Sequence, residues 1–228
     1  MIRIHVSGGG RMGAAVLALI DEADDLASAA TIAGADVVID YSHPDWTGPL
    51  LKGLLDAPKP LLVGTTGLPD EQLADLSALA ARVPVVRARN TGTGINILQA
   101  LVKQAVQAAG PGWDVEILEM HHRKKVDAPS GTAWMLLETA AGGGRGRAVP
   151  SRVGEPGART DEEIGIQTLR GGDVVGEHTV YLVGHGERIE LTHRCWDRTT
   201  FARGGVRAAR WLAEPREPGL YAMADVLA

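Results

Sequence analysis

The first 90 residues alternate between two kinds of hydrophobic pattern. Short apolar segments with the length of strands lie at 1–6, 26–32, 35–41, 60–64 and 83–88. Segments with apolar residues at helical spacing lie at 12–20, at 44–56 and after Pro69. Strands and helices in alternation predict a parallel sheet with right-handed crossovers. Arg3 and His5 interrupt the first strand, so we expect its burial to be incomplete.

The pattern changes after residue 90. The expected elements are a helix that starts near Ile95, a strand at 113–120, a helix at 132–141, a polar loop at 142–161, strands at 163–169, 174–183 and 188–195, and a helix at 200–213. The apolar positions of the first of these helices are Leu98, Leu101, Val102 and Ala105. Because short turns join the last three strands, we expect neighbouring strands to pair antiparallel.

Composition narrows the functional classes. Of the 228 residues, 45% are hydrophobic and 22% are charged, which is typical of a globular chain. A net charge of −5 argues against nucleic acid or an anionic membrane surface as partner and favours a small molecule or a protein. No apolar run approaches the roughly 18 residues of a membrane span, and Met1 is not followed by a secretory signal. We therefore expect a cytoplasmic location.

Glycines at 8, 10 and 13 stand between a predicted strand and a predicted helix. In dinucleotide-binding folds this G-x-G-x-x-G spacing lets the backbone approach a pyrophosphate, whose charge rests on the amino end of the helix. The alternative is an ordinary turn in a chain with 29 glycines. The second strand offers neither a carboxylate for a ribose nor an arginine for a 2′-phosphate, so the choice between NAD and NADP stays open.

Two further loops follow predicted strand ends, where open α/β sheets bind ligands. One is the segment Gly64, Thr65, Thr66 and Gly67, whose small hydroxyls could line a nicotinamide site. The alternative is that its threonines cap the next helix. The other loop begins at Arg89 and Asn90. It is a candidate ligand site only in combination with the first loop.

The segment 119–133 combines titratable side chains with a predicted helix start. His121 to Lys125 is an unbroken basic run, and Ser130, Gly131 and Thr132 provide hydroxyls and amides that suit a carboxylate. An imidazole exchanges protons near neutral pH, so one of the two histidines is a candidate general acid. Lys125 could fix a second carboxylate or polarise an imine as a point charge. The alternative is a solvated charged loop. The other histidines are scattered singly, so we expect no metal site.

This segment resembles the signature of the 4-hydroxy-tetrahydrodipicolinate reductases, also called dihydrodipicolinate reductases, of the diaminopimelate route to lysine. Other segments that fall in the family's order are 10–13, 64–67, 90–96, 170–179 and 198–204. The resemblance implies an NAD(P)H-dependent oxidoreductase that reduces 4-hydroxy-tetrahydrodipicolinate, or its dehydrated form, to tetrahydrodipicolinate. It also implies a homotetramer assembled through the sheet of the second domain.

The resemblance implies an α/β fold with two domains. Residues 1–91 and 202–228 would form a Rossmann-like, parallel-sheet dinucleotide domain. Residues 92–201 would form an α+β domain, with a mixed, largely antiparallel sheet, for substrate binding and oligomerisation.

Roles for individual residues also follow from the resemblance. His121 would protonate the ring carbon after hydride delivery, with Lys125 as a second catalytic residue. The substrate dicarboxylate would be held by His122, Lys125, Ser130, Gly131 and Thr132. NADH or NADPH would be held by Gly8, Gly10, Arg11, Met12, Gly13, Gly64, Thr65, Thr66, Gly67, Arg89 and Asn90.

The sequence departs from the family at the cofactor site. Ser7 stands where the family's first loop glycine falls, Thr91 stands where a larger aromatic residue is common, and the stretch before Ala35 is shortened. These departures bear on the affinity for NAD or NADP. Alternatives to the reductase are another NAD(P) dehydrogenase of amino-acid metabolism, which has no need of 121–132 as a unit, and a dinucleotide sensor without catalysis, which needs no proton donor.

Overall fold

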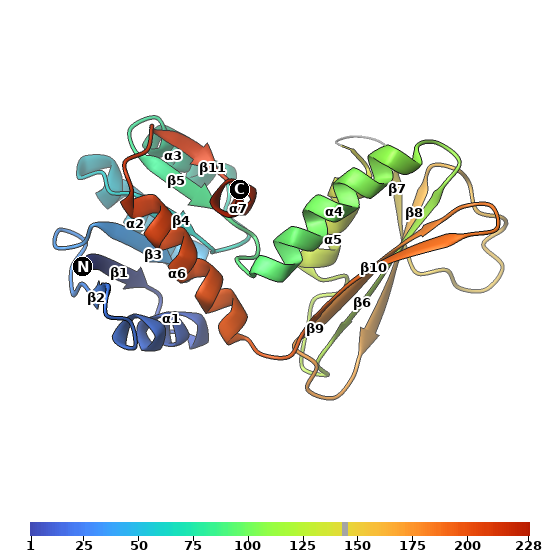
Figure 1. Cartoon of the computed structure of the whole chain (residues 1–228), viewed down its shortest axis with the longest axis horizontal. Helices are drawn as coiled ribbons and strands as arrows, with labels where there is room; N and C mark the ends of the chain where they lie inside the picture. The colour runs from blue at the N-terminus through green and yellow to red at the C-terminus, as the bar shows by residue number, and fades with distance from the viewer. Residues whose placement is uncertain (143–145) are drawn as a thin grey trace. The chain divides into compact units, whose positions relative to one another are not determined.

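The computed structural model describes residues 1–142 and 146–228, which form two compact units (Figure 1). One unit combines Met1–Thr93 with Thr199–Ala228, and the other is Gly94–Arg198. The chain therefore leaves the first unit after residue 93 and returns at 199, whereas the sequence placed these boundaries after 91 and after 201. Each unit has its own hydrophobic core.

The first unit is built on a parallel sheet. Its strands are β1 (Ile2–Ser7), β2 (Leu26–Ser28), β3 (Val37–Asp40), β4 (Leu61–Val63), β5 (Pro84–Arg87) and β11 (Gly219–Tyr221), in the spatial order β11-β5-β4-β3-β1-β2. Its helices are α1 (Arg11–Asp21), α2 (Pro44–Asp56), α3 (Asp70–Ala80), α6 (Thr199–Ala213) and α7 (Met223–Leu227). The predicted alternation of strands and helices and the parallel pairing are confirmed.

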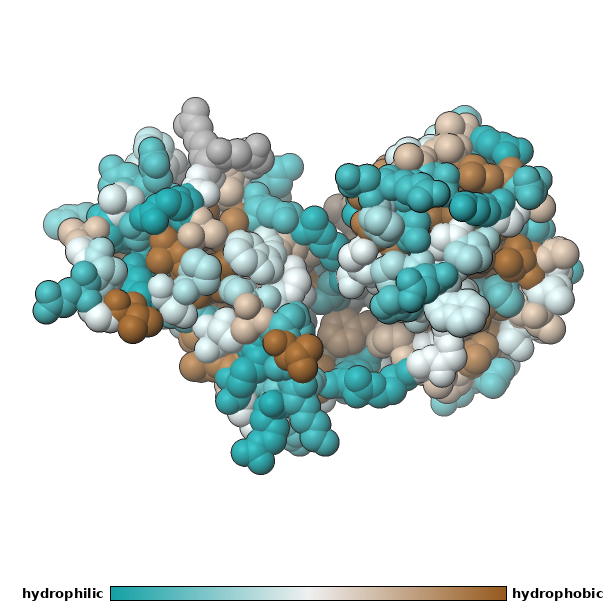
Figure 2. Space-filling view, turned by 180° about the vertical axis from the view of Figure 1, so that it is seen from behind, coloured by the Kyte–Doolittle hydropathy of each residue, from teal (hydrophilic) through white to brown (hydrophobic). Residues whose placement is uncertain are grey.

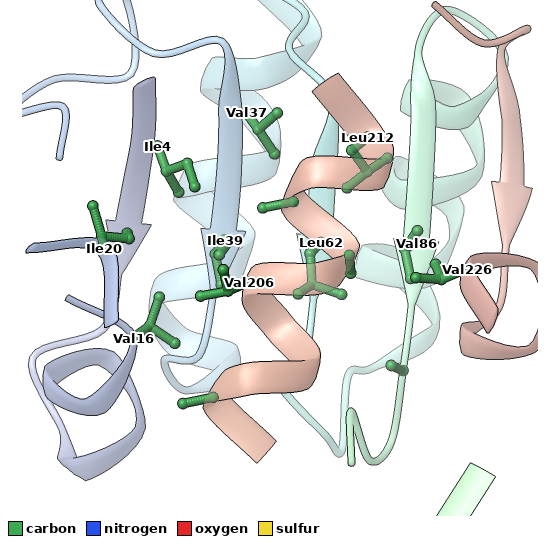
Figure 3. Packing of buried hydrophobic residues seen from close by; sticks show 14 of the residues in the cluster. Ile4, Val16, Ile20, Val37, Ile39, Leu62, Val86, Val206, Leu212 and Val226 are labelled. Carbon is green, nitrogen blue, oxygen red and sulfur yellow. The ribbon is translucent and has the colours of Figure 1, made fainter. Parts of the chain in front are cut away.

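Helices cover both faces of this sheet because its central strands are apolar on both sides. In β3, Val37 and Ile39 pack in the core beneath α1, α6 and α7, while Val38 packs in the core beneath α2 and α3. Figure 3 shows Val206 and Leu212 of α6 within the first of these cores. The predicted incomplete burial of β1 is confirmed: Ile4 is fully buried, whereas Arg3 is exposed and pairs with Asp36.

The second unit is a mixed sheet with helices on one face. Its strands are β6 (Asp114–His121), β7 (Arg147–Pro150), β8 (Glu163–Arg170), β9 (Gly176–Val183) and β10 (Arg188–Cys195), in the order β10-β9-β6-β8-β7. Its helices are α4 (Thr93–Ala109) and α5 (Gly131–Ala140). The predicted mixed sheet is confirmed, with β6 parallel to β8 and antiparallel to β9.

Several details of the second unit differ from the sequence prediction. Strands β8 and β9 do not pair, because β6 lies between them and the short turn at 171–175 crosses the end of β6. The expected loop at 142–161 contains strand β7, while its positions 143–145 lie outside the described residues. Leu101 is 46% exposed rather than buried beside Leu98. Near the chain end, β11 and α7 extend the first unit where the sequence indicated only a tail.

Hydrophobic and hydrophilic residues are interspersed on the face of the molecule seen in Figure 2. Large hydrophobic side chains that are strongly exposed include Trp46, Val126 and Trp196. Among the described residues, no helix has the length and apolar character needed to cross a membrane.

Candidate active site

Glu119 on β6 is a fully buried carboxylate. Alternate side chains of β6 face the helices, and this periodicity turns Glu119 inward in phase with the strand's apolar core residues. Its Oε1 accepts hydrogen bonds from the Ser130 backbone N–H at 3.0 Å and from Thr168 Oγ1 at 3.2 Å. Arg170 donates to both carboxylate oxygens, at 2.8 and 2.9 Å. A carboxylate can be buried at this point because these donors replace its hydration.

His121, the last residue of β6, lies beside this carboxylate and is 8% exposed. Its Nδ1 lies 2.5 Å from Glu119 Oε2, and the nitrogen must donate if that carboxylate is ionised, because an ionised carboxylate can only accept. Gly176 on β9 leaves room for the ring, since an added Cβ would come within 3.0 Å of His121 Nε2. The backbone carbonyl of His121 accepts a hydrogen bond from the Gly171 N–H at 3.0 Å. With Nδ1 engaged by Glu119, Nε2 is the ring nitrogen suited to exchange a proton with a bound molecule.

The surroundings of Glu119 keep its carboxylate ionised. Burial alone would raise its pKa, but hydrogen bonds from His121, Arg170 and the Ser130 N–H outweigh burial and hold the pKa at about 2. Since the ordinary value is 4.5, the stabilisation from this ionised group is complete above about pH 4.5 and is lost as the pH falls towards 2.

The strand register places a row of polar side chains across the helix-facing side of the sheet. Thr168 on β8, Glu119 on β6, His178 on β9 and His193 on β10 are consecutive cross-strand partners. The rings of His121 and His178 meet edge to face, with centroids 5.1 Å apart. Burial lowers the pKa of His178 to about 3, and the nearby His121 adds to this effect, so His178 is uncharged at neutral pH.

This burial predicts a pH-dependent stability. Between pH 6.5 and 3 the unfolded chain binds a proton at His178 that the folded chain does not, so stability is lost as the pH falls. In urea titrations between pH 6.5 and 5, His178→Gln should remove a loss of up to about 1.4 kcal/mol per pH unit. His185→Gln, in an exposed turn, is the matched control. Equal pH slopes for His178→Gln and the unsubstituted protein would contradict a neutral, buried His178.

Ser130 caps helix α5 and is itself buried. Its side chain accepts the Ala133 N–H at 3.2 Å, and its Oγ lies 3.2 Å from His178 Nε2. The predicted helix start at this point is confirmed. Because the Ser130 hydroxyl serves the cap and contacts His178, it is the exposed Gly131 and the half-buried Thr132 that bring the amino end of α5 to solvent.

Only part of the basic run from His121 to Lys125 is exposed to solvent. His122 and Lys125 are half-buried, whereas Arg123 and Lys124 are exposed. Lys125 Nζ lies 2.8 Å from Asp127 Oδ1. Although burial opposes the effect, this ammonium group lowers the pKa of the Asp127 carboxyl. The structure thus distinguishes the buried from the exposed side chains of this segment, which the sequence alone did not indicate.

In the first unit, the glycine loop borders a pocket of about 410 Å³. Its lining residues are Ser7, Gly8, Gly9, Gly10, Tyr41, Ser42, His43 and Trp46. Helix α1 begins at Arg11, its N-cap Gly10 provides no side-chain cap, and its first turn carries no acidic residue. Added Cβ atoms at Gly9 and Gly10 would meet nothing within 4 Å, so the loop backbone borders open space. These features fit the phosphate groups of a dinucleotide.

A second pocket, of about 220 Å³, also lies in the first unit. It is lined by Met12, Tyr41, Gly64, Ala88, Arg89, Asn90, Thr91 and Phe201. Tyr41 lines both pockets. Its hydroxyl donates to Thr91 Oγ1 at 2.7 Å, and Thr91 donates in turn to the Phe201 carbonyl at 2.8 Å. Burial raises the pKa of Tyr41 to about 12, so its hydroxyl stays protonated.

Two glycines make space for the Tyr41 ring. An added Cβ would lie 2.2 Å from the ring at Gly64 and 2.5 Å from its hydroxyl at Gly205. Gly64→Ala should therefore destabilise the protein by roughly 1–3 kcal/mol, measured by thermal unfolding. Gly53→Ala, at an exposed site of α2 where a Cβ meets nothing, should stabilise it by roughly 0.5–1 kcal/mol. An unchanged Tm for Gly64→Ala would contradict the observed fit of the ring.

Thr65 has a structural contact that the sequence did not indicate. Its hydroxyl donates to Asp40 Oδ2 at 3.0 Å, and Thr47 donates to the same oxygen at 2.6 Å. Ser42 binds the other carboxylate oxygen through its N–H and its hydroxyl. Asp40 is fully buried, so this group of hydrogen bonds ties the ends of β3 and β4 together.

Comparison with known families decides the relationship of this chain. Residues 24–91 match the family model described as dihydrodipicolinate reductase, N-terminus, and residues 94–227 match the model described as dihydrodipicolinate reductase, C-terminus. The chain belongs to the dihydrodipicolinate reductase family. The two matched ranges meet close to the point where the chain passes from one structural unit to the other.

Individual relatives agree with this membership. The chain is 49% identical over 227 residues to a 4-hydroxy-tetrahydrodipicolinate reductase of Alkalilimnicola ehrlichii, covering 98% of this chain and 82% of the relative. It is 44% identical over 242 residues to the corresponding enzyme of Akkermansia muciniphila, covering 100% of this chain and 98% of the relative.

Solved structures share the fold. The dipicolinate-bound dihydrodipicolinate reductase of Paenisporosarcina sp. TG-14 superposes with a TM-score of 0.79 at 23% identity, covering 97% of both chains. GenD2 from gentamicin A biosynthesis, solved in complex with NAD, gives a TM-score of 0.61 at 13% identity, covering 99% of this chain and 90% of that one.

The structure groups the residues selected from the sequence into separate sets. His121 and Ser130 meet at Glu119, while Gly131 and Thr132 begin α5. In the first unit, Gly8 and Gly10 border one pocket, and Met12, Gly64, Arg89 and Asn90 border the other. The linings of these two pockets do not include Arg11, Gly13, Thr65, Thr66 or Gly67. Gly13 is buried in the first turn of α1. An added Cβ there would lie 1.8 Å from the Gly8 carbonyl oxygen, so this position has no room for a larger residue.

Sequence reasoning missed several residues of these sites. Tyr41, Ser42 and His43 directly follow a fully buried strand, and that position could have drawn attention to them. His178 lies in phase with the buried Val180 on β9, which could have marked it as an inward-facing histidine.

Proposed function

We propose that this chain reduces 4-hydroxy-tetrahydrodipicolinate, or its dehydrated form, to tetrahydrodipicolinate with NADH or NADPH in the diaminopimelate route to lysine. Membership of the dihydrodipicolinate reductase family carries the proposal. The buried His121 supports it, because Glu119, which holds this ring, also binds the Ser130 N–H at the start of α5, a helix start suited to a carboxylate.

In the proposed reaction His121 acts as the general acid. The 4-hydroxyl leaves as water, and a reduced nicotinamide held by the first unit would supply a hydride to position 4 of the dehydrated ring. The proton on His121 Nε2 passes to the adjacent ring carbon, and the Nδ1–H stays hydrogen-bonded to Glu119. Since Glu119 remains ionised, it stabilises the protonated imidazole before transfer.

The substrate carboxylates are assigned to the second unit. We assign one carboxylate to the start of α5 at Gly131 and Thr132, with Ser130 holding that start in place through its cap. We assign the other to Lys125, whose ammonium group supplies a point charge, with His122 nearby in the chain. Lys125 is paired with Asp127 in this structure, so substrate binding would exchange one carboxylate partner for another.

The dinucleotide is assigned to the first unit. The uncapped start of α1 suits the pyrophosphate, with Gly8 and Gly10 in the loop and Arg11 and Gly13 in the first turn of the helix. The smaller pocket, at Met12, Gly64, Arg89 and Asn90, is assigned to the nicotinamide end, with Thr65, Thr66 and Gly67 in the following loop. Strand β2 ends at Ser28, followed by Ala29 and Ala30, so a ribose would rely on other contacts.

Measuring the oxidation of NADH and of NADPH with 4-hydroxy-tetrahydrodipicolinate generated in situ tests this proposal. Consumption of either dinucleotide, with competitive inhibition by pyridine-2,6-dicarboxylate, is the expected result. Aspartate and diaminopimelate with the oxidised dinucleotides serve as comparison substrates. Turnover of one of these instead of the cyclic substrate would assign the chain to another dehydrogenase activity. Dinucleotide binding without turnover of any substrate would favour a sensor.

We also propose that the chain assembles as a homotetramer through the sheet of the second unit. Helices α4 and α5 pack on one face of this sheet, and the other face presents half-buried Leu118, Met120 and Tyr181 beside Leu169, which is 47% exposed. Light scattering on the purified protein should give four times the chain mass, and Leu169→Glu should lower it. A monomer at micromolar concentration would contradict this assembly.

A further inference from the structure

We propose that Glu119 is the positioning residue of His121, holding the imidazole in one tautomer and tying it to the amino end of α5. The inference rests on the proposed function, because His121 needs a fixed tautomer only if it delivers a proton. It assigns a task to a buried carboxylate that touches neither substrate nor cofactor in that reaction.

The first step concerns the tautomer of His121. An ionised carboxylate can only accept hydrogen bonds, so the ring nitrogen 2.5 Å from Glu119 Oε2 must carry its hydrogen. The neutral ring therefore has its proton on Nδ1 and a lone pair on Nε2. When the ring is protonated, the mobile proton is the one on Nε2. Proton delivery then ends in the tautomer that Glu119 already favours.

The second step concerns how Glu119 is itself held. Arg170 donates to both of its oxygens and also to the Asp127 carbonyl at 2.7 Å. A guanidinium group that binds a carboxylate with two hydrogen bonds favours the ionised form of the carboxylate and fixes the orientation of its plane. Arg170 ends β8, which is parallel to β6, so the strand register sets the position of the guanidinium group. Glu119 is thus a rigid acceptor for His121.

The third step links the acid to the helix start. Glu119 Oε1 accepts the Ser130 N–H, while Oε2 accepts the His121 Nδ1–H. One carboxylate therefore sets the distance between the proton donor and the start of α5. A substrate carboxylate bound at that start would meet a histidine whose position depends on the same anchor.

The substitution Glu119→Gln removes the negative charge of the side chain and keeps nearly the same size and shape. Three donors lie at Oε1, from Ser130, Thr168 and Arg170, so the new amide oxygen should take that side. The new NH2 group would then face His121 Nδ1 and oppose its hydrogen. The ring should change to the tautomer with its proton on Nε2, and its protonated form should become less favourable.

Steady-state kinetics test the consequence. Glu119→Gln should lower kcat about a hundredfold and change the substrate KM less than about threefold. Added to His121→Asn, the same substitution should lower kcat less than about threefold further, because its effect passes through the ring. Glu162→Gln, which makes the same carboxylate-to-amide change at an exposed position outside the site, is the control and should keep kcat within about threefold. A full additional loss in the double variant would overturn the proposal.

Nitrogen NMR of histidine-labelled protein tests the tautomer without turnover. The His121 signals, identified by their loss in His121→Asn, should show protonated Nδ1 and bare Nε2 at alkaline pH, and the reverse in Glu119→Gln. If Glu119→Gln does not fold, Glu119→Asp withdraws the carboxylate by one methylene and should also lose the Nδ1–H preference. A neutral His121 with its proton on Nε2 in the unsubstituted protein would overturn the proposal. Inactivity on the cyclic substrate with the expected tautomer would instead contradict the proposed function alone.

Discussion

Replacing His121 with asparagine is expected to lower kcat by roughly two to four orders of magnitude, the range for losing a general acid. The reason is geometric as well as chemical. The imidazole is 8% exposed and held at Nδ1 by Glu119, so water is poorly placed to substitute for it. An asparagine amide can occupy part of the same space but cannot donate a proton of comparable acidity. Binding of substrate and dinucleotide should change little.

Steady-state rates with the cyclic substrate, together with dinucleotide binding followed by fluorescence, check this expectation. His185→Gln removes an imidazole from an exposed turn and should leave kcat unchanged, which controls for a general effect of histidine loss. Because removing one partner of a buried pair is costly, the unfolding midpoint of His121→Asn is measured as well. A well-folded variant with undiminished kcat would show that His121 is not the acid.

Replacing Lys125 with methionine is expected to lower kcat/KM by roughly ten- to a hundredfold, mostly through KM. A hydrogen bond to a charged group contributes roughly 1.5–3 kcal/mol, and each 1.4 kcal/mol corresponds to about a tenfold change. Methionine keeps the length of the side chain and removes its charge. Lys125 is half-buried in this structure, so its ammonium group has lost part of its hydration and should bind an anion more strongly than a fully solvated one.

Lys124→Met is the matched control, since Lys124 is the neighbouring residue and is exposed. Its KM should stay within about twofold of the unsubstituted value. A third variant, Asp127→Asn, removes the anion that Lys125 pairs with and should lower KM. Equal KM values for Lys124→Met and Lys125→Met would show that Lys125 does not contact the substrate.

Much of the fold follows from hydrophobic pattern because its strands are buried. Strands β3 and β4 are buried at every position, so they appear in the sequence as apolar runs, with Asp40 at the end of β3 as the exception. Helix α2 has the bounds that the sequence predicts, since Pro44 at its first position marks the start. Strand β7 has no such signal: it is short, half-exposed and ends in Pro150, as befits an edge strand.

The histidine of the site could be selected from the sequence, whereas its partners could not. His121 stands in a run that any search for proton donors would find. Arg170 is 51 residues away from Glu119 along the chain, and the two meet because β8 lies next to β6. The short turn after β8 favours pairing with β9 instead, so the sequence alone gives the wrong neighbour. Contacts that depend on strand order therefore need the structure.

The same limit applies to the glycines and Tyr41. Gly64 was selected as a ligand contact, yet the structure also shows it making room for an aromatic ring from a different loop. A missing side chain does not indicate which neighbour needs the space. Only the packed structure distinguishes a glycine that borders open space, such as Gly10, from one that makes room for a side chain.

The split of the first unit across the sequence has a consequence for biosynthesis. A nascent chain that has emerged only as far as residue 198 contains five strands of the parallel sheet but lacks α6, β11 and α7. Val206, Leu212 and Val226, which fill the core against Ile39 and Leu62, are still to be translated. The contiguous second unit can fold first on the ribosome, while an apolar face of the earlier sheet stays open to chaperones until translation ends.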